Sequence, residues 1–248
     1  MKIYFHVVTH DSGLAPNPFQ GLCTQALCTP SHMNANLQKD DWLLGVSSAI
    51  NGLRSLVYAM EISEVVYMAE YVNNPKYNIK RPKVTAHYKD CCGDNIYKVA
   101  QGGSINLSDW SRQSSAFHQS GYNFRKDIGE RKNSFVRNQG KGNKVYVSSH
   151  YHYYGCARSD NWEPLQSIIS AKLARSARGI RKLENAAWED ISETISCAGG
   201  KRNLSKMSKG IIYGWPKDAA SHCPYNNNAK ATVVHTFTCH KPAGSCLP

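Results

Sequence analysis

The stretch KIYFHVVTHDSGLAPNPF, residues 2–19, decides how the fold begins. Residues 2–9 are rich in β-branched and aromatic side chains, which predicts a buried first strand. The turn-forming DSG at residues 11–13 then ends the strand and opens a loop that continues to Gly21. Because loops held by rigid strands carry many binding and catalytic groups, we expect the functional surface in this part of the chain.

Further strands are expected outward from this start. Residues 42–47 (WLLGVS) follow a charged turn, and the apolar run at 56–67 predicts one strand with both faces mostly covered. The turn at Gly93-Asp94-Asn95 precedes a strand at 96–100, and the aromatic segment 144–155 predicts another strand.

The remaining segments predict helices, loops and an insert. Residues 23–28 suggest a short helix, and the polar residues 73–89 suggest an excursion over the surface. Residues 102–143 are rich in Ser, Gly, Asn and Arg, which predicts a long flexible insert. Apolar residues then recur at helical spacing through 163–198, so we expect a helical region there that covers the sheet. Short apolar runs at 211–215 and 232–238 complete a chain that we interpret as one domain, residues 1–248.

The net charge points to a polyanionic partner. Thirty Lys and Arg residues against 18 Asp and Glu give a formal charge of +12, which suits DNA, RNA or a nucleotide. A basic protein that is merely soluble is the plainer interpretation. The opening residues lack a signal-peptide pattern, and no window approaches the roughly 18 apolar residues of a spanning helix. Nine cysteines without framework spacing suit reduced thiols. We therefore expect a cytoplasmic protein that does not insert into a membrane.

The first loop and the turn at residue 93 supply the candidate site. As catalytic candidates we take His10 as acid or base with Asp11 holding its tautomer, Cys23 as nucleophile, and Asp94 as a further base. The candidate substrate-binding residues are Asn17, Thr24, Asn95 and Tyr97. The plainer alternatives are that Asp-Ser-Gly and Pro-Asn-Pro only form turns and that the thiols are buried and inert.

Metal binding has weak support in the sequence. The pairs His222-Cys223 and Cys239-His240 contain ligand types for zinc, but their spacing is looser than in structural zinc sites. We therefore assign no metal ligand, and the sequence does not identify a cofactor.

Two basic tracts could contact phosphates. In the expected insert, aromatic residues lie among cations, as is typical where phosphates are neutralised and bases stack; the candidate nucleic-acid-binding residues are Arg125, Lys126, Arg131, Lys132 and Arg137. The second tract follows the helical region and drifts around it; it comprises Lys172, Arg175, Arg178, Arg181 and Lys182. The plainer interpretation of either tract is a solvated surface.

Five blocks in order carry a resemblance to a known family: THDSGLAPNPF at 9–19, LCTQALCTP at 22–30, DDWLLG at 40–45, LVYAMEISEV at 56–65 and GDNIY at 93–97. They resemble the second of the nucleotide-modification-associated domain families, which occur in phages and bacteria beside genes for hypermodified DNA bases. The resemblance implies a role linked to DNA base modification. The pattern WLLG followed by LVYAM is also similar to small barrels of the PUA and ASCH kind, which cradle a base or nucleotide. The expected fold is therefore α+β, with a small PUA-like mixed β-barrel or curved sheet and covering helices.

Two functions compete at this point. The first is a binding module for a base or nucleotide, with DNA or a nucleotide and other DNA-modification proteins as partners. The second is an enzyme of the transferase or hydrolase type that modifies a nucleotide or DNA base. A structural partner in a modification complex is a third, plainer possibility.

Overall fold

A six-stranded sheet forms the centre of the fold, with strand order β10-β1-β3-β4-β9-β11. The computed structural model describes residues 1–26, 35–49, 54–83, 88–99, 109–112, 134–155, 162, 165–173, 179–184, 186–199, 210–212 and 216. The strands of this main sheet are β1 (Ile3–Val8), β3 (Trp42–Ser47), β4 (Leu56–Glu61), β9 (His150–Tyr153), β10 (Arg181–Leu183) and β11 (Ile211–Ile212). β1 and β3 run parallel, so the strands predicted at 2–9 and 42–47 are confirmed and lie side by side.

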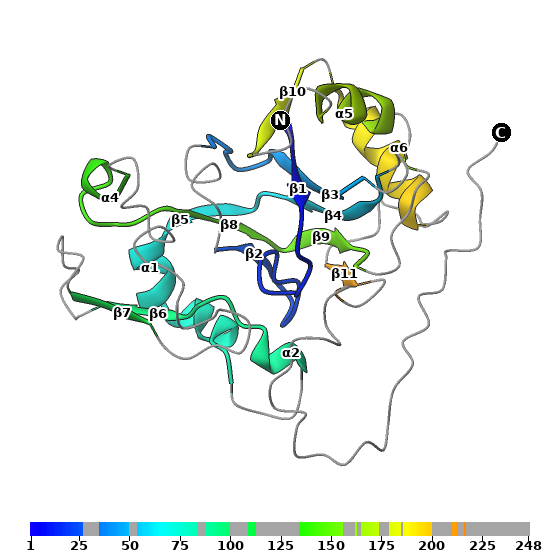
Figure 1. Ribbon diagram of the computed structural model, residues 1–248. Coiled ribbons are helices and arrows are strands. Elements are labelled where there is room, and N and C mark those ends of the chain that lie inside the picture. The colour runs from blue at the N-terminus through cyan, green and yellow to red at the C-terminus, as the bar shows by residue number, and fades with distance from the viewer. Residues whose placement is uncertain are drawn as a thin grey trace, which may run out of the picture.

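A second, three-stranded sheet continues from the first (Figure 1). It contains β2 (Cys23–Gln25), β8 (Lys144–Ser148) and β5 (Glu64–Tyr67), all antiparallel. Only Ile62 and Ser63 separate β4 from β5, and only Ser149 separates β8 from β9. The single strands predicted at 56–67 and 144–155 are therefore wrong, because each segment bends and passes from one sheet to the other.

The segment at residues 23–28 corrects another prediction. Instead of a short helix, residues 23–25 form β2, because Thr24 lies opposite Val147 and also bridges to Asn17 in the preceding loop. Long-range pairing thus decides the local conformation.

The sheets do not close into a barrel within the described residues. The third sheet there is the hairpin of β6 (Tyr97–Val99) and β7 (Trp110–Arg112). The α+β class is confirmed. Of the two expected forms, the barrel is not found among the described residues, and the PUA-like curved sheet stays a prediction, because the architecture is a pair of open, connected sheets.

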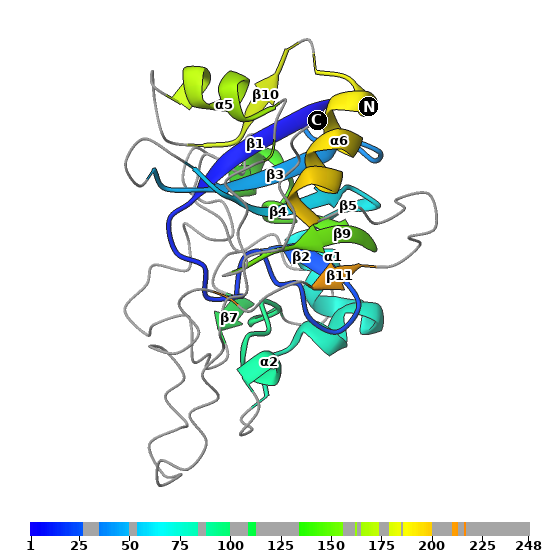
Figure 2. The same cartoon turned by 90° about the vertical axis from the view of Figure 1, so that its right-hand side faces the viewer.

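Two helices cover one face of the main sheet (Figure 2). α5 (Leu165–Leu173) and α6 (Trp188–Gly199) contribute Ile169 and Ile191 to an apolar cluster with Phe5 and Leu44. The predicted cover is confirmed, but the expected helical region 163–198 is interrupted by the edge strand β10.

Short helices follow β5. α1 (Met68–Asn73) and the 3-10 helix η1 (Pro75–Lys80) pack against the second sheet, where Tyr71 and Tyr77 share an apolar cluster with Val145. α2 (Tyr88–Cys91) contacts the loop after β1, because Tyr88 donates a hydrogen bond to the carbonyl of Ser12.

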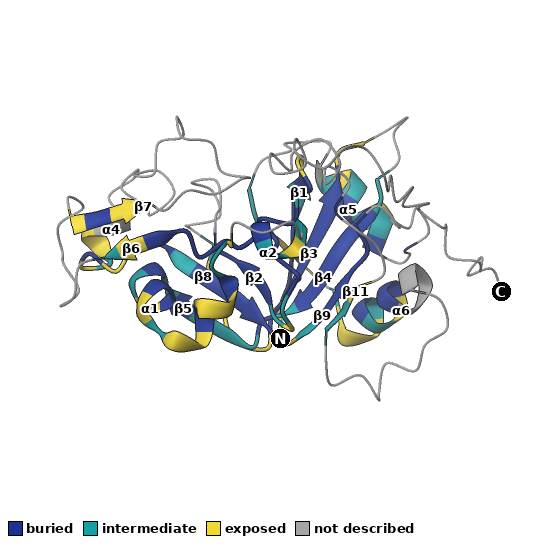
Figure 3. Ribbon diagram, turned by 90° about the horizontal axis from the view of Figure 1, so that it is seen from below, coloured by how far each residue is buried: buried dark blue, intermediate teal, exposed yellow. Residues whose placement is uncertain are grey.

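The residues of η1, predicted as part of a surface excursion at 73–89, are mostly exposed, but Tyr77 and Lys80 are fully buried. Figure 3 shows the buried strands of both sheets and the exposed outer faces of α1 and α6. α4 (Ser134–Arg137) falls inside the expected insert, most of which lies outside the described residues, as does the run at 232–238.

Tyrosine dominates the face of the main sheet opposite α5 and α6. The buried tyrosines there are Tyr4, Tyr58, Tyr151 and Tyr153, with Tyr146 from the second sheet. The ring of Tyr58 lies over Gly45, where an added Cβ would come within 2.0 Å of the ring. Glycine is needed at this position because any side chain would displace Tyr58.

Candidate functional site

Hydrogen bonds from tyrosine hydroxyl groups hold the loop between β1 and β2 in place. Tyr153 donates a 2.5 Å hydrogen bond to Asp11 Oδ1, and Tyr151 donates one of 2.6 Å to the carbonyl of Pro18. Tyr88 donates a third, of 2.5 Å, to the carbonyl of Ser12. The loop that the sequence identified as a candidate site is therefore fixed along much of its length.

A buried ammonium organises the second half of this loop. Lys80 Nζ lies within 2.7 Å of Asn17 Oδ1 and 2.6 Å of the Phe19 and Leu22 carbonyl oxygens, with the Asn17 carbonyl at 3.1 Å. Burial lowers the pKa of Lys80 to about 8, although the negative charge of Asp94 opposes the shift. Three backbone carbonyl oxygens and one side-chain amide oxygen therefore surround this fully buried cation.

A buried carboxyl group lies close to this ammonium. Asp94 Oδ2 accepts a hydrogen bond of 2.7 Å from Thr24, and Oδ1 accepts one of 2.6 Å from Tyr71. Burial raises the pKa of Asp94, while the charge of Lys80 and these hydrogen bonds act in the opposite direction. Gly93, which precedes Asp94, allows the backbone to pass close to that of Lys80, because a Cβ at this position would lie 2.3 Å from the carbonyl oxygen of Lys80.

The two sequence segments predicted to form the site do converge. Asn17 Nδ2 donates to the carbonyls of Gly13 and Cys92, at 2.9 and 2.6 Å. Asn95 Nδ2 donates to the carbonyls of Tyr71 and Tyr77, both at 3.1 Å. We call the group Asn17, Thr24, Lys80, Asp94 and Asn95 the interior network; all five side chains are fully buried. Tyr97 is also buried, in the apolar cluster next to the second sheet.

The predicted catalytic residues are separated by their environments. His10 and Asp11 are neighbours in the loop after β1, but His10 is exposed whereas the Asp11 side chain is buried. Burial raises the pKa of the Cys23 thiol to about 12, which favours the protonated form and disfavours a thiolate nucleophile at neutral pH. The catalytic roles of these residues, and of Asp94, stay predictions.

A row of polar groups next to Asp11 was not predicted from the sequence. In the sheet register His6 lies opposite Gly45, Gly45 opposite Tyr58, and Tyr58 opposite Tyr153. Because Gly45 has no side chain, Tyr58 reaches across β3, and its hydroxyl lies 2.5 Å from His6 Nε2. Strand alternation in residues 2–9 could have placed His6 on the same face as Tyr4 and Val8, but its partners depend on the sheet order.

A basic cavity lies at the edge of the main sheet, where α5 meets β10. It has a volume of about 420 Å³ and is lined by Ala171, Lys172, Arg181 and Lys182. Arg181 donates to the carbonyl of Lys172 at 3.3 Å, and Lys172 donates to the carbonyl of Lys182 at 3.2 Å. Lys182 also pairs with Glu184 at 3.1 Å. These contacts hold the end of α5 against β10 and concentrate positive charge around one hollow.

Of the other basic residues predicted to contact nucleic acid, only some lie within the described part of the chain. Arg137 is exposed on α4. Arg125, Lys126, Arg131 and Lys132 lie outside the described residues, as do Arg175 and Arg178 of the second tract.

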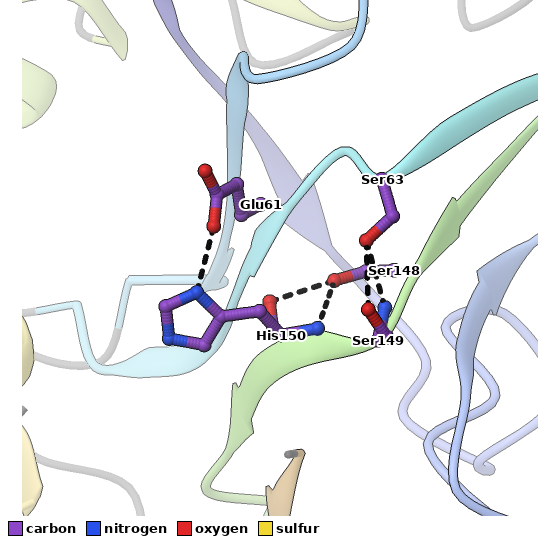
Figure 4. Close-up of polar contacts among 5 residues, drawn as sticks. All are labelled: Glu61, Ser63, Ser148, Ser149 and His150. Carbon is purple, nitrogen blue, oxygen red and sulfur yellow. Dashed lines mark hydrogen bonds and ion pairs between the residues drawn. The ribbon is translucent and has the colours of Figure 1, made fainter. Parts of the chain in front are cut away.

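Serine, histidine and glutamate side chains meet where the strands change sheets (Figure 4). His150 Nδ1 lies 2.7 Å from Glu61 Oε2, whereas Ser148 Oγ donates to the His150 carbonyl and accepts from the His150 backbone N–H, at 2.7 and 3.1 Å. Ser63 and Ser149 contact each other through their hydroxyls at 3.1 Å. The imidazole points toward Glu61 and away from the hydroxyls, so the serines satisfy backbone groups of the bend and do not form a nucleophile–base pair.

The described part of the chain contains no cluster of three or more His, Cys, Asp or Glu residues able to hold a metal ion. Nor does any helix there have the length and apolar character needed to cross a membrane.

Comparison with known proteins gives one match. The family model described as nucleotide modification associated domain 2 matches residues 1–221, which is most of the chain. No curated protein and no solved structure matches.

Proposed function

Because the chain belongs to the family of nucleotide modification associated domain 2, we propose that it binds a nucleotide or nucleic acid whose base is modified. The observation that carries this proposal is the basic cavity, where three cationic side chains from α5 and β10 surround one hollow. In this proposal the cavity holds phosphate.

The chemistry of the cavity suits phosphate. Arginine offers a planar set of donors that matches phosphate oxygens, and lysine adds a compact charge. Arg181 and Lys172 are half-buried and are positioned by backbone carbonyls, so they are partly ordered before a ligand arrives. The volume of about 420 Å³ falls in the range of small-ligand pockets.

The rest of the molecule supports a polyanionic ligand. The formal charge of +12 favours association with a phosphate backbone through the release of counterions. The proposal also includes a PUA-like cradle for the base or nucleotide, formed by the curved, connected sheets.

A titration tests the proposal. The full chain is titrated with labelled single- and double-stranded DNA, with and without modified bases, at about 50 and about 200 mM salt. Lys172→Gln combined with Arg181→Gln should weaken binding by about tenfold or more, since two phosphate contacts are lost. The matched control is Lys39→Gln combined with Lys98→Gln, which removes the same charge from two exposed sites elsewhere. Equal losses in both double variants, or a wild-type chain that binds no DNA at low salt, would contradict it.

A second candidate function is an enzyme that modifies a nucleotide or base. The observation in its favour is that Asp11 with Tyr153, and His6 with Tyr58, form two close acid–base pairs beneath the loop after β1. Asp11 would act as general base, with His10 and Asp94 as the further candidates.

The enzyme hypothesis has its own test. The protein is incubated with nucleotides and with phage DNA, and the nucleosides are analysed by mass spectrometry. Asp11→Asn and Tyr153→Phe should each abolish a product formed by the wild type. Product formation that survives both substitutions would remove this pair from the mechanism.

A further inference from the structure

A second group of cations lies on the second sheet, at the end away from the bends at Ser63 and Ser149. Lys144 opens β8, and in the sheet register it lies opposite Tyr67, the last residue of β5. Lys141 precedes β8, and its ammonium lies over the ring of Tyr67, 5.7 Å from the ring centroid. We call Lys141 and Lys144 the distal cluster.

Neutral groups hold both ammonium groups of the distal cluster. Lys144 donates a hydrogen bond of 3.2 Å to the side-chain oxygen of Asn36, and Lys141 lies over the π-electrons of Tyr67. Neither lysine forms an ion pair with any residue that the structure describes. Because Lys141 is exposed and Lys144 is partly exposed, their uncompensated charges are open to a ligand.

Hydrogen bonds fix the backbone that carries the cluster. The Lys141 carbonyl accepts from the Ala69 N–H, and the Asn143 carbonyl accepts from the Met68 N–H, both at 2.9 Å. These bonds tie the turn between α4 and β8 to the start of α1. Arg137, exposed at the end of α4, leads into the same turn and brings a further cation to it. A phosphate bound there would therefore order side chains but not the backbone, which lowers the entropic cost of binding.

The distal cluster and the basic cavity lie at different ends of the molecule. Figures 1 and 3 both show α4 and β5 at one end and α5 at the other. In the main sheet β1 and β3 separate β10 from β4, and β5 continues beyond the end of β4. With about 4.8 Å between neighbouring strands and about 3.3 Å per residue along a strand, Arg181 and Tyr67 lie on the order of 20 Å apart. At a spacing of about 3.4 Å per phosphate, one strand of nucleic acid needs about six phosphates to cover this distance.

We propose that one strand of nucleic acid contacts both groups of cations, with phosphates at the basic cavity and further phosphates at the distal cluster. The inference rests on the proposed function, because it requires phosphate at the cavity. The ligand is then a nucleic acid strand of about six or more phosphates, since a free nucleotide is too short to contact both groups. Once the cavity holds one phosphate, the rest of the strand is at high effective concentration near the cluster, so affinity rises with strand length.

The test compares oligo-dT strands of about 3 and about 16 nucleotides, because only the longer strand reaches from the cavity to the cluster. Lys141→Gln combined with Lys144→Gln should weaken binding of the longer strand by about tenfold at about 50 mM salt. The same variant should bind the shorter strand within about twofold of wild type, because that strand contacts the cavity alone. Lys172→Gln combined with Arg181→Gln should weaken binding of both strands.

The matched control is Lys83→Gln combined with Lys89→Gln, which removes the same charge from exposed lysines before and on α2 and should change neither affinity. If the Lys141 and Lys144 variant binds the longer strand as tightly as wild type while the cavity variant does not, the inference is wrong and the proposed function stands. Equal losses in the cluster and control variants also overturn the inference, because total charge alone would then explain them. A wild type that binds neither strand contradicts both proposals.

Discussion

The interior network and the basic cavity both gather polar side chains from distant parts of the chain, but they satisfy them differently. In the interior network Lys80 and Asp94 are fully buried and make their hydrogen bonds within the protein. At the basic cavity Lys172 and Arg181 remain partly exposed and donate hydrogen bonds to backbone carbonyl groups. Because carbonyl groups carry no net charge, they do not neutralise the positive charge of these two side chains. The comparison indicates that the first region holds the loop in shape, whereas the second keeps its charge available to a ligand.

Removing the buried ammonium is the largest expected change. Lys80→Met should lower the free energy of unfolding by about 3–5 kcal/mol, because Asp94 loses its nearest cation and the loop carbonyls lose their donor. Urea unfolding measures the change. Lys98→Met, at an exposed site, should stay within about 0.5 kcal/mol of wild type. A change below about 1 kcal/mol for Lys80→Met would show that the interior network does not hold the loop.

The pH dependence sharpens the same comparison. The pKa of Lys80 is about 8 in the folded state against 10.5 in the unfolded chain, so the unfolded state holds more protons between these values. Stability from this group should therefore rise as pH increases from about 8 to about 10.5, by at most roughly 3 kcal/mol, and be lost as pH falls again. The stability difference between wild type and Lys80→Met, measured by urea unfolding across this window, isolates the contribution. A difference that stays constant with pH would contradict the assignment.

A smaller effect is expected at Thr24. Thr24→Val keeps the shape but removes the hydroxyl that donates to Asp94, which should cost about 1–3 kcal/mol of stability. The control is Thr9→Val at an exposed position, where little change is expected. If Thr24→Val left stability unaltered and weakened ligand binding instead, the residue would belong to a binding site, as the sequence first suggested.

The smallest change in stability is expected at the cavity. Lys172→Gln combined with Arg181→Gln should alter the free energy of unfolding by about 1 kcal/mol or less, because both side chains are partly exposed. Thermal or urea unfolding gives the value. A loss as large as that of Lys80→Met would mean that these cations hold the fold as the interior network does.

The sequence predicted local features better than long-range ones. The strands at 2–9 and 42–47 were predictable because their apolar residues form continuous runs. The bends at Ser63 and Ser149 were not, since they depend on contacts between two separate strand pairs, such as the bond from the Ser63 backbone N–H to the Val147 carbonyl.

The candidate sites show the same limit. Asn17, Asp94 and Asn95 were identified in expected turns and Thr24 in an expected short helix, and the four do come together. Lys80 was not identified, because it lies in a polar segment that looked exposed. The charges of the basic cavity were visible in the sequence. Their common position was not, because Arg181 and Lys182 were interpreted as helical whereas they lie on β10.

The salt dependence of single-stranded DNA binding tests the central claim most directly. If Lys172 and Arg181 each neutralise a phosphate, the slope of log affinity against log salt should become shallower by about 1.4 in the double variant. The control pair Lys39→Gln and Lys98→Gln should keep the wild-type slope. An unchanged slope in the cavity variant, with the wild type still binding, would contradict the assignment of phosphate to the basic cavity.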